Sequence, residues 1–156
     1  MIKIFLRILL AQLFVFSVMS CKDEEPASQE SPEEIAVREL TDGGNANWVV
    51  ANGGSVTQDG NNVTAAFSEF EIRFVSNQER KYTSTSNTLV DASGTWGFSG
   101  NNFDKIQLSG MLPAAGKEIS FSRTGDKLIL MFTVPFPEQA RVTALAGSYV
   151  FELVKE

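Results

Sequence analysis

From residue 48 onward, hydrophobic and polar positions alternate along short segments, a period of two that is typical of β-strands with one buried face. The clearest segment spans residues 69–74, where charged and apolar side chains alternate without exception. The pattern predicts strands at 48–51, 63–67, 70–74, 80–85, 94–98, 106–108, 119–121, 128–134 and 149–153. It therefore predicts an all-β domain, a small antiparallel up-and-down barrel or sandwich of about 8–10 strands.

One predicted strand, within residues 127–134, is apolar on both faces, because Ile129 and Met131 lie opposite Leu128 and Leu130. Two interpretations follow from this pattern. The favoured one is a central strand whose second face is covered by a helix or by a crossing strand. In the other interpretation, that face lines a ligand cavity or forms a protein interface.

A short helix is predicted at residues 32–41. Ser31 is suited to the N-cap, Pro32 to the first helical position, and Glu34 completes a capping box. Gly43 and the glycine that follows it end the helical run. Because this helix precedes the first strand, we expect it to plug or brace the β domain.

Residues 1–20 have the features of an export signal. Lys3 and Arg7 are the only charged residues before Cys21, and a mainly apolar run fills residues 8–20. This run is shorter than the ~20 apolar residues that a membrane-spanning helix needs. A positive start, an apolar run and a small residue at the cleavage point predict a signal peptide instead.

The segment Val18–Cys21 resembles the lipobox of bacterial lipoproteins. The resemblance implies that the signal is cut before Cys21 and that the cysteine sulfur carries a diacylglycerol, which anchors the chain to the membrane. The alternative interpretation is an ordinary secretory signal that ends at a cysteine by chance.

The four residues after the cysteine are similar to the tag that sends some Gram-negative lipoproteins to the outer face of the outer membrane: Lys22, Asp23, Glu24 and Glu25. The resemblance implies an outer-membrane protein exposed at the cell surface. A plain acidic linker, with the domain on the periplasmic face, is the alternative.

The composition is that of one acidic domain on a tether. The 156 residues include 13 Lys or Arg and 19 Asp or Glu, which gives a formal net charge of −6. Residues 22–31 contain no large apolar side chain, so residues 21–31 are predicted to form the lipidated tether and residues 32–156 the β domain. No basic cluster offers a footprint for nucleic acid or anionic lipid, so membrane attachment depends on the lipid.

The residue types that are missing exclude several chemistries. The chain has no histidine, and Cys21 is its only cysteine. A Ser-His-Asp or Cys-His catalytic group is therefore excluded, as are histidine- or cysteine-based zinc, copper and haem sites. Residues 59–62 lack the acidic spacing of a calcium loop and are predicted to form a hairpin turn. No cofactor is expected.

Carboxylates are the remaining candidates for catalysis, as in glycoside hydrolysis: Glu69, Glu71, Asp91, Asp104 and Glu118. Glu69 and Glu71 fall on the polar face of an alternating strand, where solvated charges are expected. We therefore expect a protein that is not an enzyme.

The candidates for lining a ligand site are Trp48, Tyr82, Trp96 and Met131. The three aromatic rings, together with Tyr149, are also candidates for stacking on sugar rings. In a small β domain, however, Trp and Tyr belong more often to the core.

Several motifs, taken in order over residues 35–155, resemble bacterial lipocalin-like lipoprotein domains: residues 70–74, 82–85, 93–98, 125–130 and 145–151. In that family a helix precedes a Gly-x-Trp opening strand, and here the spacing from Gly44 to Trp48 is longer. The resemblance implies an up-and-down barrel with an internal or end-on cavity for a small apolar molecule.

The leading functional hypothesis is therefore a non-enzymatic, lipid-anchored lipoprotein of the cell surface that binds a small apolar ligand in a lipocalin-like barrel. One alternative is a glycan-binding accessory protein of a surface uptake complex. Another is a protein-interaction or structural module, whose partner protein the sequence does not identify. Fold alone does not decide among them.

Overall fold

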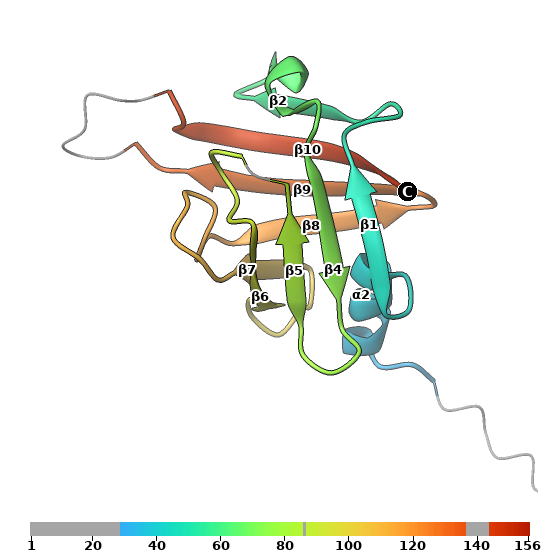
Figure 1. Cartoon of the computed structure of the whole chain (residues 1–156). Coiled ribbons are helices and arrows are strands. Elements are labelled where there is room, and N and C mark those ends of the chain that lie inside the picture. Colours follow the sequence, from blue (N-terminus) through green and yellow to red (C-terminus); the bar gives the residue numbers. More distant parts are fainter. Residues whose placement is uncertain (1–28, 86, 137–143) are drawn as a thin grey trace, which may run out of the picture.

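The computed structural model describes residues 29–85, 87–136 and 144–156. Within them, a short α-helix precedes ten strands that belong to one sheet (Figure 1). In chain order the elements are α2 (Pro32–Thr41), β1 (Asn45–Val49), β2 (Ser55–Gln58), β3 (Asn61–Asn62), the 3₁₀ helix η1 (Thr64–Phe67), β4 (Glu71–Val75), β5 (Lys81–Ser84), β6 (Ser93–Phe98), β7 (Lys105–Leu108), β8 (Ile119–Thr124), β9 (Lys127–Val134) and β10 (Gly147–Lys155).

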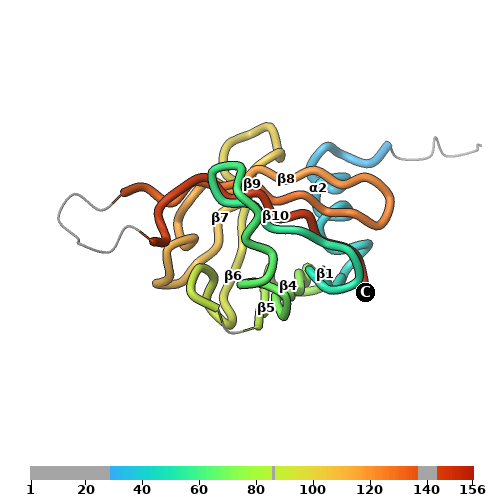
Figure 2. The backbone as a smooth tube through the Cα atoms, turned by 90° about the horizontal axis from the view of Figure 1, so that it is seen from above, coloured from blue at the N-terminus to red at the C-terminus, as the bar shows by residue number. Residues whose placement is uncertain are grey.

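The sheet closes on itself as an eight-stranded up-and-down barrel. Strand β1 pairs with β4 on one side and with β10 on the other, so the barrel runs in the order β1-β4-β5-β6-β7-β8-β9-β10, with antiparallel neighbours throughout. Figure 2 shows β1, β4 and β5 on one side of the interior and β8, β9 and β10 on the other. The predicted all-β barrel is confirmed, and it is consistent with a lipocalin-like fold.

Strand β10 shares one edge between two partners. Its residues 149–152 pair with β2, and Val154 and Lys155 pair with β1, so the β2–β3 hairpin extends the sheet beyond the barrel. The hairpin turn predicted at residues 59–62 is confirmed. Asp59 and Gly60 have φ values of 49° and 80°, the left-handed backbone that a type I′ turn requires.

Helix α2 forms where the capping signals predict it. The Ser31 hydroxyl oxygen accepts a hydrogen bond from the Glu34 backbone N–H at 3.2 Å, and the Glu34 carboxylate accepts one from the Ser31 N–H at 2.7 Å. The helix ends at Asp42, whose φ is 50°. Ala36 and Leu40 are buried, which turns one face of the helix onto the barrel. Among the described residues, no helix is long and apolar enough to cross a membrane.

Buried apolar side chains, many of them aromatic, form one contiguous cluster in the interior of the barrel. One group packs near the β2–β3 hairpin, where Phe67 and Phe70 lie 5.2 and 4.9 Å from the ring of Phe151. A second group packs nearer α2, where Phe74 and Phe98 lie 5.9 and 5.7 Å from Trp96 in edge-to-face geometry. Such pairs add about 0.5–1.5 kcal/mol each to the gain from burial. The interior is therefore occupied by the protein's own side chains.

The prediction of a strand at residues 63–67 is wrong, because residues 64–67 form the 3₁₀ helix η1. Side chains redirect its backbone. The Asn62 side-chain oxygen accepts a hydrogen bond from the Thr64 N–H, and the Thr64 hydroxyl accepts one from the Val56 N–H, both at 2.9 Å. Local bonds of this kind compete with strand pairing. The apolar Phe67 is still buried, but as part of a cap and not of a strand.

The prediction that both faces of β9 are covered is also wrong. Leu128, Leu130 and Phe132 point into the core, whereas Met131 on the other face is 43% exposed. Helix α2 contacts β1, β4 and β8 instead. The outer face of β9 is therefore accessible and only partly apolar, with Ile129 and Met131 between Lys127 and Thr133.

Candidate functional site

The residues predicted to direct localisation lie outside the described residues. These are the signal at residues 1–20, the lipidation site Cys21 and the tag of Lys22, Asp23, Glu24 and Glu25. The described chain begins at residue 29 and leads directly into α2. The chain therefore enters the barrel at the end that the helix covers.

Three of the four residues predicted to line a ligand site point into the interior, and each donates its polar hydrogen to a backbone carbonyl. The donor–acceptor distances are 2.8 Å from Trp48 to Leu40, 2.6 Å from Tyr82 to Ser109 and 3.1 Å from Trp96 to Val75. All three side chains are at most 4% exposed. Burial, with the nearby charge of Asp91, raises the pKa of the Tyr82 phenol. The fourth residue, Met131, lies on the outer surface.

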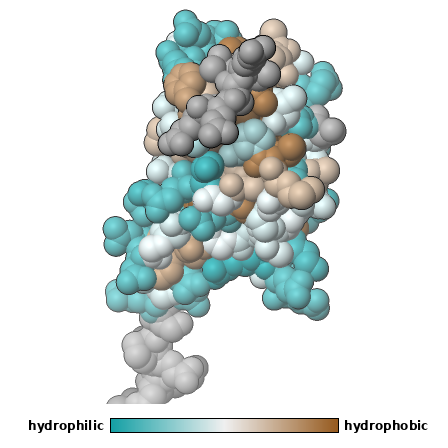
Figure 3. All heavy atoms as spheres, turned by 90° about the vertical axis from the view of Figure 1, so that its left-hand side faces the viewer, coloured by the Kyte–Doolittle hydropathy of each residue, from teal (hydrophilic) through white to brown (hydrophobic). Residues whose placement is uncertain are grey.

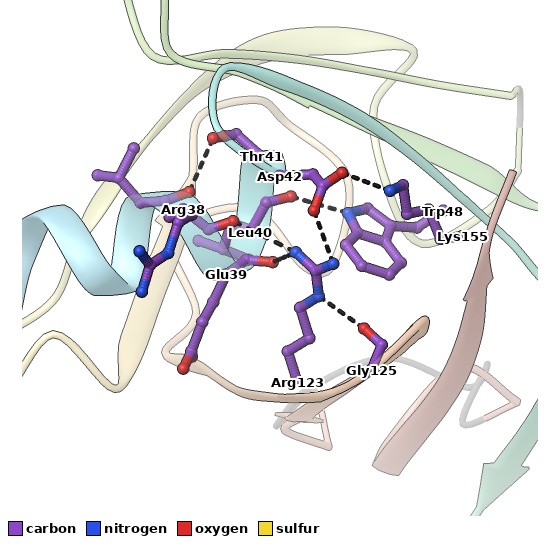
Figure 4. Close-up of polar contacts among 10 residues, drawn as sticks. Arg38, Glu39, Leu40, Thr41, Asp42, Trp48, Arg123, Gly125 and Lys155 are labelled. Carbon is purple, nitrogen blue, oxygen red and sulfur yellow. Dashed lines mark hydrogen bonds and ion pairs between the residues drawn. The ribbon is translucent and has the colours of Figure 1, made fainter.

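An arginine that the sequence patterns do not single out fastens the C-terminal end of α2 (Figure 4). The Arg123 guanidinium lies over the Trp48 ring, 5.2 Å from its centroid, and its Nη2 is 2.7 Å from an oxygen of Asp42. Its other nitrogens donate to backbone carbonyls of the last helical turn and of Gly125. The hydrogen bonds from Lys155 and Arg123 lower the pKa of Asp42 below its ordinary value. Because these groups are mutually paired, the junction holds structure together.

A second arginine fastens the other end of the helix. Arg80 forms an ion pair with Glu33 in the first turn of α2. Its guanidinium carbon lies 5.3 Å from the Trp96 ring and 4.8 Å from the Phe98 ring. Both ends of α2 are thus tied to the barrel by an arginine stacked on a buried tryptophan.

Loops cover much of the opposite end of the barrel. The backbone N–H groups of Met111 and Leu112 donate to one oxygen of Asp91, at 2.9 and 2.8 Å, while Leu89 and Ala114 are fully buried. Figure 3 views the side of the molecule where these loops lie, and hydrophobic residues form patches there among hydrophilic ones. Two exposed apolar residues belong to the connections at this end, Met111 at 95% and Phe136 at 67%.

The carboxylates considered for catalysis are spread over the molecule. Asp91 holds the loop just described, and Glu118 pairs with Lys105 at 2.9 Å. That pairing lowers the pKa of the Glu118 carboxyl. Glu118 and the predicted ligand-lining residue Met131 line one shallow groove, and Glu71 lines another together with other polar side chains. The described residues contain no group of three or more acidic side chains arranged to hold a metal ion.

The groove that Glu71 lines lies on the outer face of β1, β4 and β5, beside the end of β10. It has a volume of about 480 Å³. Alternation along the strands turns one set of side chains outward to form its wall. The lining residues are Asn45, Asn47, Glu71, Arg73, Thr83, Ser84, Thr85 and Glu156. Amide, carboxylate, guanidinium and hydroxyl groups are all present, so the surface of the groove is mainly polar.

The strand register brings the polar groups together. Arg73 on β4 is directly opposite Asn47 on β1 and Thr83 on β5. The Asn47 amide nitrogen donates to Glu71 at 3.2 Å and to Glu156 at 2.6 Å. The two carboxylates of the groove are thus linked through one amide.

Arg73 itself is only partly used. Its Nε donates to the side-chain oxygen of Asn45 at 2.6 Å. Its two Nη atoms form no hydrogen bond or ion pair with any residue of the described ranges. Alternation along β4 predicts that Arg73 and Glu71 face solvent. It does not predict their neighbours on β1 and β10, because those strands pair with residues distant in sequence.

A groove with an incompletely paired guanidinium is the arrangement best suited to take up a ligand.

No protein-family model matches the chain, and no curated protein matches it in sequence. The barrel and its outer groove are therefore the features from which we infer a function.

Proposed function

We propose that this protein is a non-enzymatic binding module, held at the cell surface by a lipid on Cys21, that binds glycan in the outer groove of β1, β4 and β5. The observation that carries the proposal is the Arg73 guanidinium, whose two Nη groups are unpaired among described residues and lie in one groove with two carboxylates bridged by Asn47.

The choice of glycan follows from the chemistry of the groove. A sugar offers hydroxyl groups that both donate and accept hydrogen bonds. The carboxylates of Glu71 and Glu156 accept such bonds, the Arg73 guanidinium donates them, and the hydroxyl of Thr83 does both. An apolar molecule would leave these groups without partners and would gain little from contact with them.

The interior supports a small apolar ligand less well. Phe151 alone packs against Phe67, Phe70 and Phe132, and the buried side chains form one cluster. Protein interiors are close-packed, so a ligand would have to displace side chains that already fill the space. Binding of a fatty acid in the interior is therefore the alternative that an experiment has to exclude.

The experiment compares retention on immobilised polysaccharides with the fluorescence response to fatty acids. We expect wild-type protein to be retained, and Arg73→Ala to lose retention. Lys81→Ala is the matched control, because Lys81 is an exposed cation on neighbouring β5 that pairs with Glu79 and does not line the groove. A fatty-acid response with no retention on any polysaccharide would contradict the proposal.

The surface location has its own test. Cys21→Ser should release the protein from the membrane fraction. Replacement of residues 22–25 by alanine should leave the anchor but hide the domain from protease added to whole cells. Unchanged membrane retention of Cys21→Ser would contradict the lipid anchor. Unchanged protease access after replacement of residues 22–25 would show that these residues are only a linker.

A further inference from the structure

The groove is divided into a cationic half and an anionic half. Arg73 and Glu71 lie two residues apart on the same face of β4, yet they form no ion pair. Arg73 is instead bonded to Asn45, nearer the start of β1, while Glu71 is bonded to Asn47. The two amides therefore hold the opposite charges apart instead of allowing them to neutralise each other.

We propose that this division selects a sugar that carries a carboxylate, such as a uronic acid, and this inference depends on the function proposed above. The unpaired Nη groups of Arg73 form a planar fork that matches the two oxygens of a carboxylate. Hydrogen bonds between two charged groups are shorter and about twice as strong as those between neutral groups. A neutral sugar cannot offer Arg73 such a partner.

The anionic half requires the rest of the same ligand. The carboxylates of Glu71 and Glu156 are acceptors only, and each receives one described hydrogen bond from the Asn47 amide. Their remaining lone pairs need donors, and the ring hydroxyls of a sugar supply them. A uronic acid carries a carboxylate at one side of the ring and hydroxyls at the other, so one ring presents both kinds of group that the groove lacks.

The charge balance sets a limit on the ligand. The groove contains two carboxylates and one guanidinium, and the whole chain has a formal net charge of −6. A polymer with an acid on every sugar would place further negative charges within the ~8 Å screening length of Glu71 or Glu156. The groove therefore suits a single acidic sugar at the end of a glycan or within an otherwise neutral one.

The test uses titration calorimetry with a matched pair of ligands, methyl glucuronide and methyl glucoside, which differ at the carboxylate. We expect wild-type protein to bind the glucuronide about tenfold more tightly. Arg73→Gln should abolish this preference, while Glu71→Gln should weaken the binding of both sugars. Lys81→Gln, on the neighbouring strand, should leave both affinities unchanged. Urea unfolding of each variant confirms that it is folded.

The outcomes separate the two proposals. Equal binding of both sugars, weakened to the same extent by Arg73→Gln, would overturn the preference for an acidic sugar but keep the glycan-binding groove. Binding of neither sugar, together with a response to fatty acids, would overturn both. A preference for the glucuronide that survives Arg73→Gln would also overturn the inference, because the carboxylate would then bind elsewhere.

Discussion

Two arginines on the same barrel have opposite environments. Arg123, near the helix, stacks on Trp48, pairs with Asp42 and donates to three backbone carbonyls, and its side chain is only 17% exposed. Arg73, on the outer wall, has one described hydrogen bond, to Asn45. A polar group whose bonds are complete contributes to the stability of the fold. One whose bonds are incomplete at an open surface is available to a ligand.

The comparison predicts that substitutions at the helix end change stability, whereas substitutions in the groove change binding. The helix end contains buried aromatics and a network that joins α2, β1 and β8. The groove contains side chains that project from an already paired sheet.

The largest effect is expected for Trp48→Ala. Trp48 is fully buried, donates to the Leu40 carbonyl and supports the Arg123 guanidinium. Removal of the indole should leave a cavity and an unpaired carbonyl, at a cost of about 3–5 kcal/mol in urea unfolding. Trp48→Phe keeps most of the packing and should cost clearly less. A change below ~1 kcal/mol for the alanine variant would contradict the structural role given to this junction.

The next effect is expected for Arg123→Ala. The substitution removes the stacking on Trp48, the ion pair with Asp42 and the hydrogen bonds to two carbonyls of the last helical turn, one of which still accepts from the Asp42 N–H. Partial exposure of both partners limits the loss to about 1–3 kcal/mol. Arg38→Ala is the control. Arg38 pairs with Glu30 at the surface, both side chains about half exposed, so its loss should cost less than about 0.5 kcal/mol. Equal losses of stability in Arg123→Ala and Arg38→Ala would contradict the structural role given to Arg123.

The features that the sequence predicts correctly are local ones. The capping box of Ser31 and Glu34 lies within one helical turn, and the alternation at residues 69–74 needs only neighbouring residues. The turn at residues 59–62 likewise depends on its own residue types. Local signals of this kind therefore establish the helix, most of the strands and the all-β class, whereas the choice between barrel and sandwich depends on the distant pairing of β1 with β10.

The features that the sequence does not predict depend on distant contacts. Arg123 meets Trp48 only because β8 and β1 lie near the same end of the barrel, and Asn47 joins Glu71 to Glu156 only through the register of β1 with β4 and β10. The strand predicted at residues 63–67 fails for a different reason, because short-range hydrogen bonds of Asn62 and Thr64 replace strand pairing. The groove could be predicted as a polar face but not as a site.

A smaller effect is expected when the helix end is titrated with acid. Hydrogen bonds from Lys155 and Arg123 lower the pKa of Asp42 below its ordinary value of 3.8. A carboxyl with a lower pKa in the folded state stabilises the fold at pH values above its unfolded pKa, and this contribution disappears as the pH falls through the folded pKa. Thermal unfolding from pH 6 to pH 3 should therefore show a loss of stability that Asp42→Asn reduces. An identical slope in the variant would show that Asp42 is not a source of the acid sensitivity.

The smallest change in stability is expected for Arg73→Ala, and it is the most direct test of the comparison. Arg73 is exposed on β4, and its one described hydrogen bond joins it to an exposed Asn45. Surface substitutions away from packed or capped positions usually change the free energy of unfolding by no more than about 0.5 kcal/mol. Urea unfolding of Arg73→Ala should therefore coincide closely with that of the wild type, although retention on glycan is lost. If Arg73→Ala destabilised the barrel as much as Arg123→Ala, the guanidinium of Arg73 would be a structural group as well, and loss of retention could no longer be attributed to a missing contact with the ligand. A stable variant that no longer binds separates the two arginines by role, because the same change of side chain then removes stability at one site and recognition at the other.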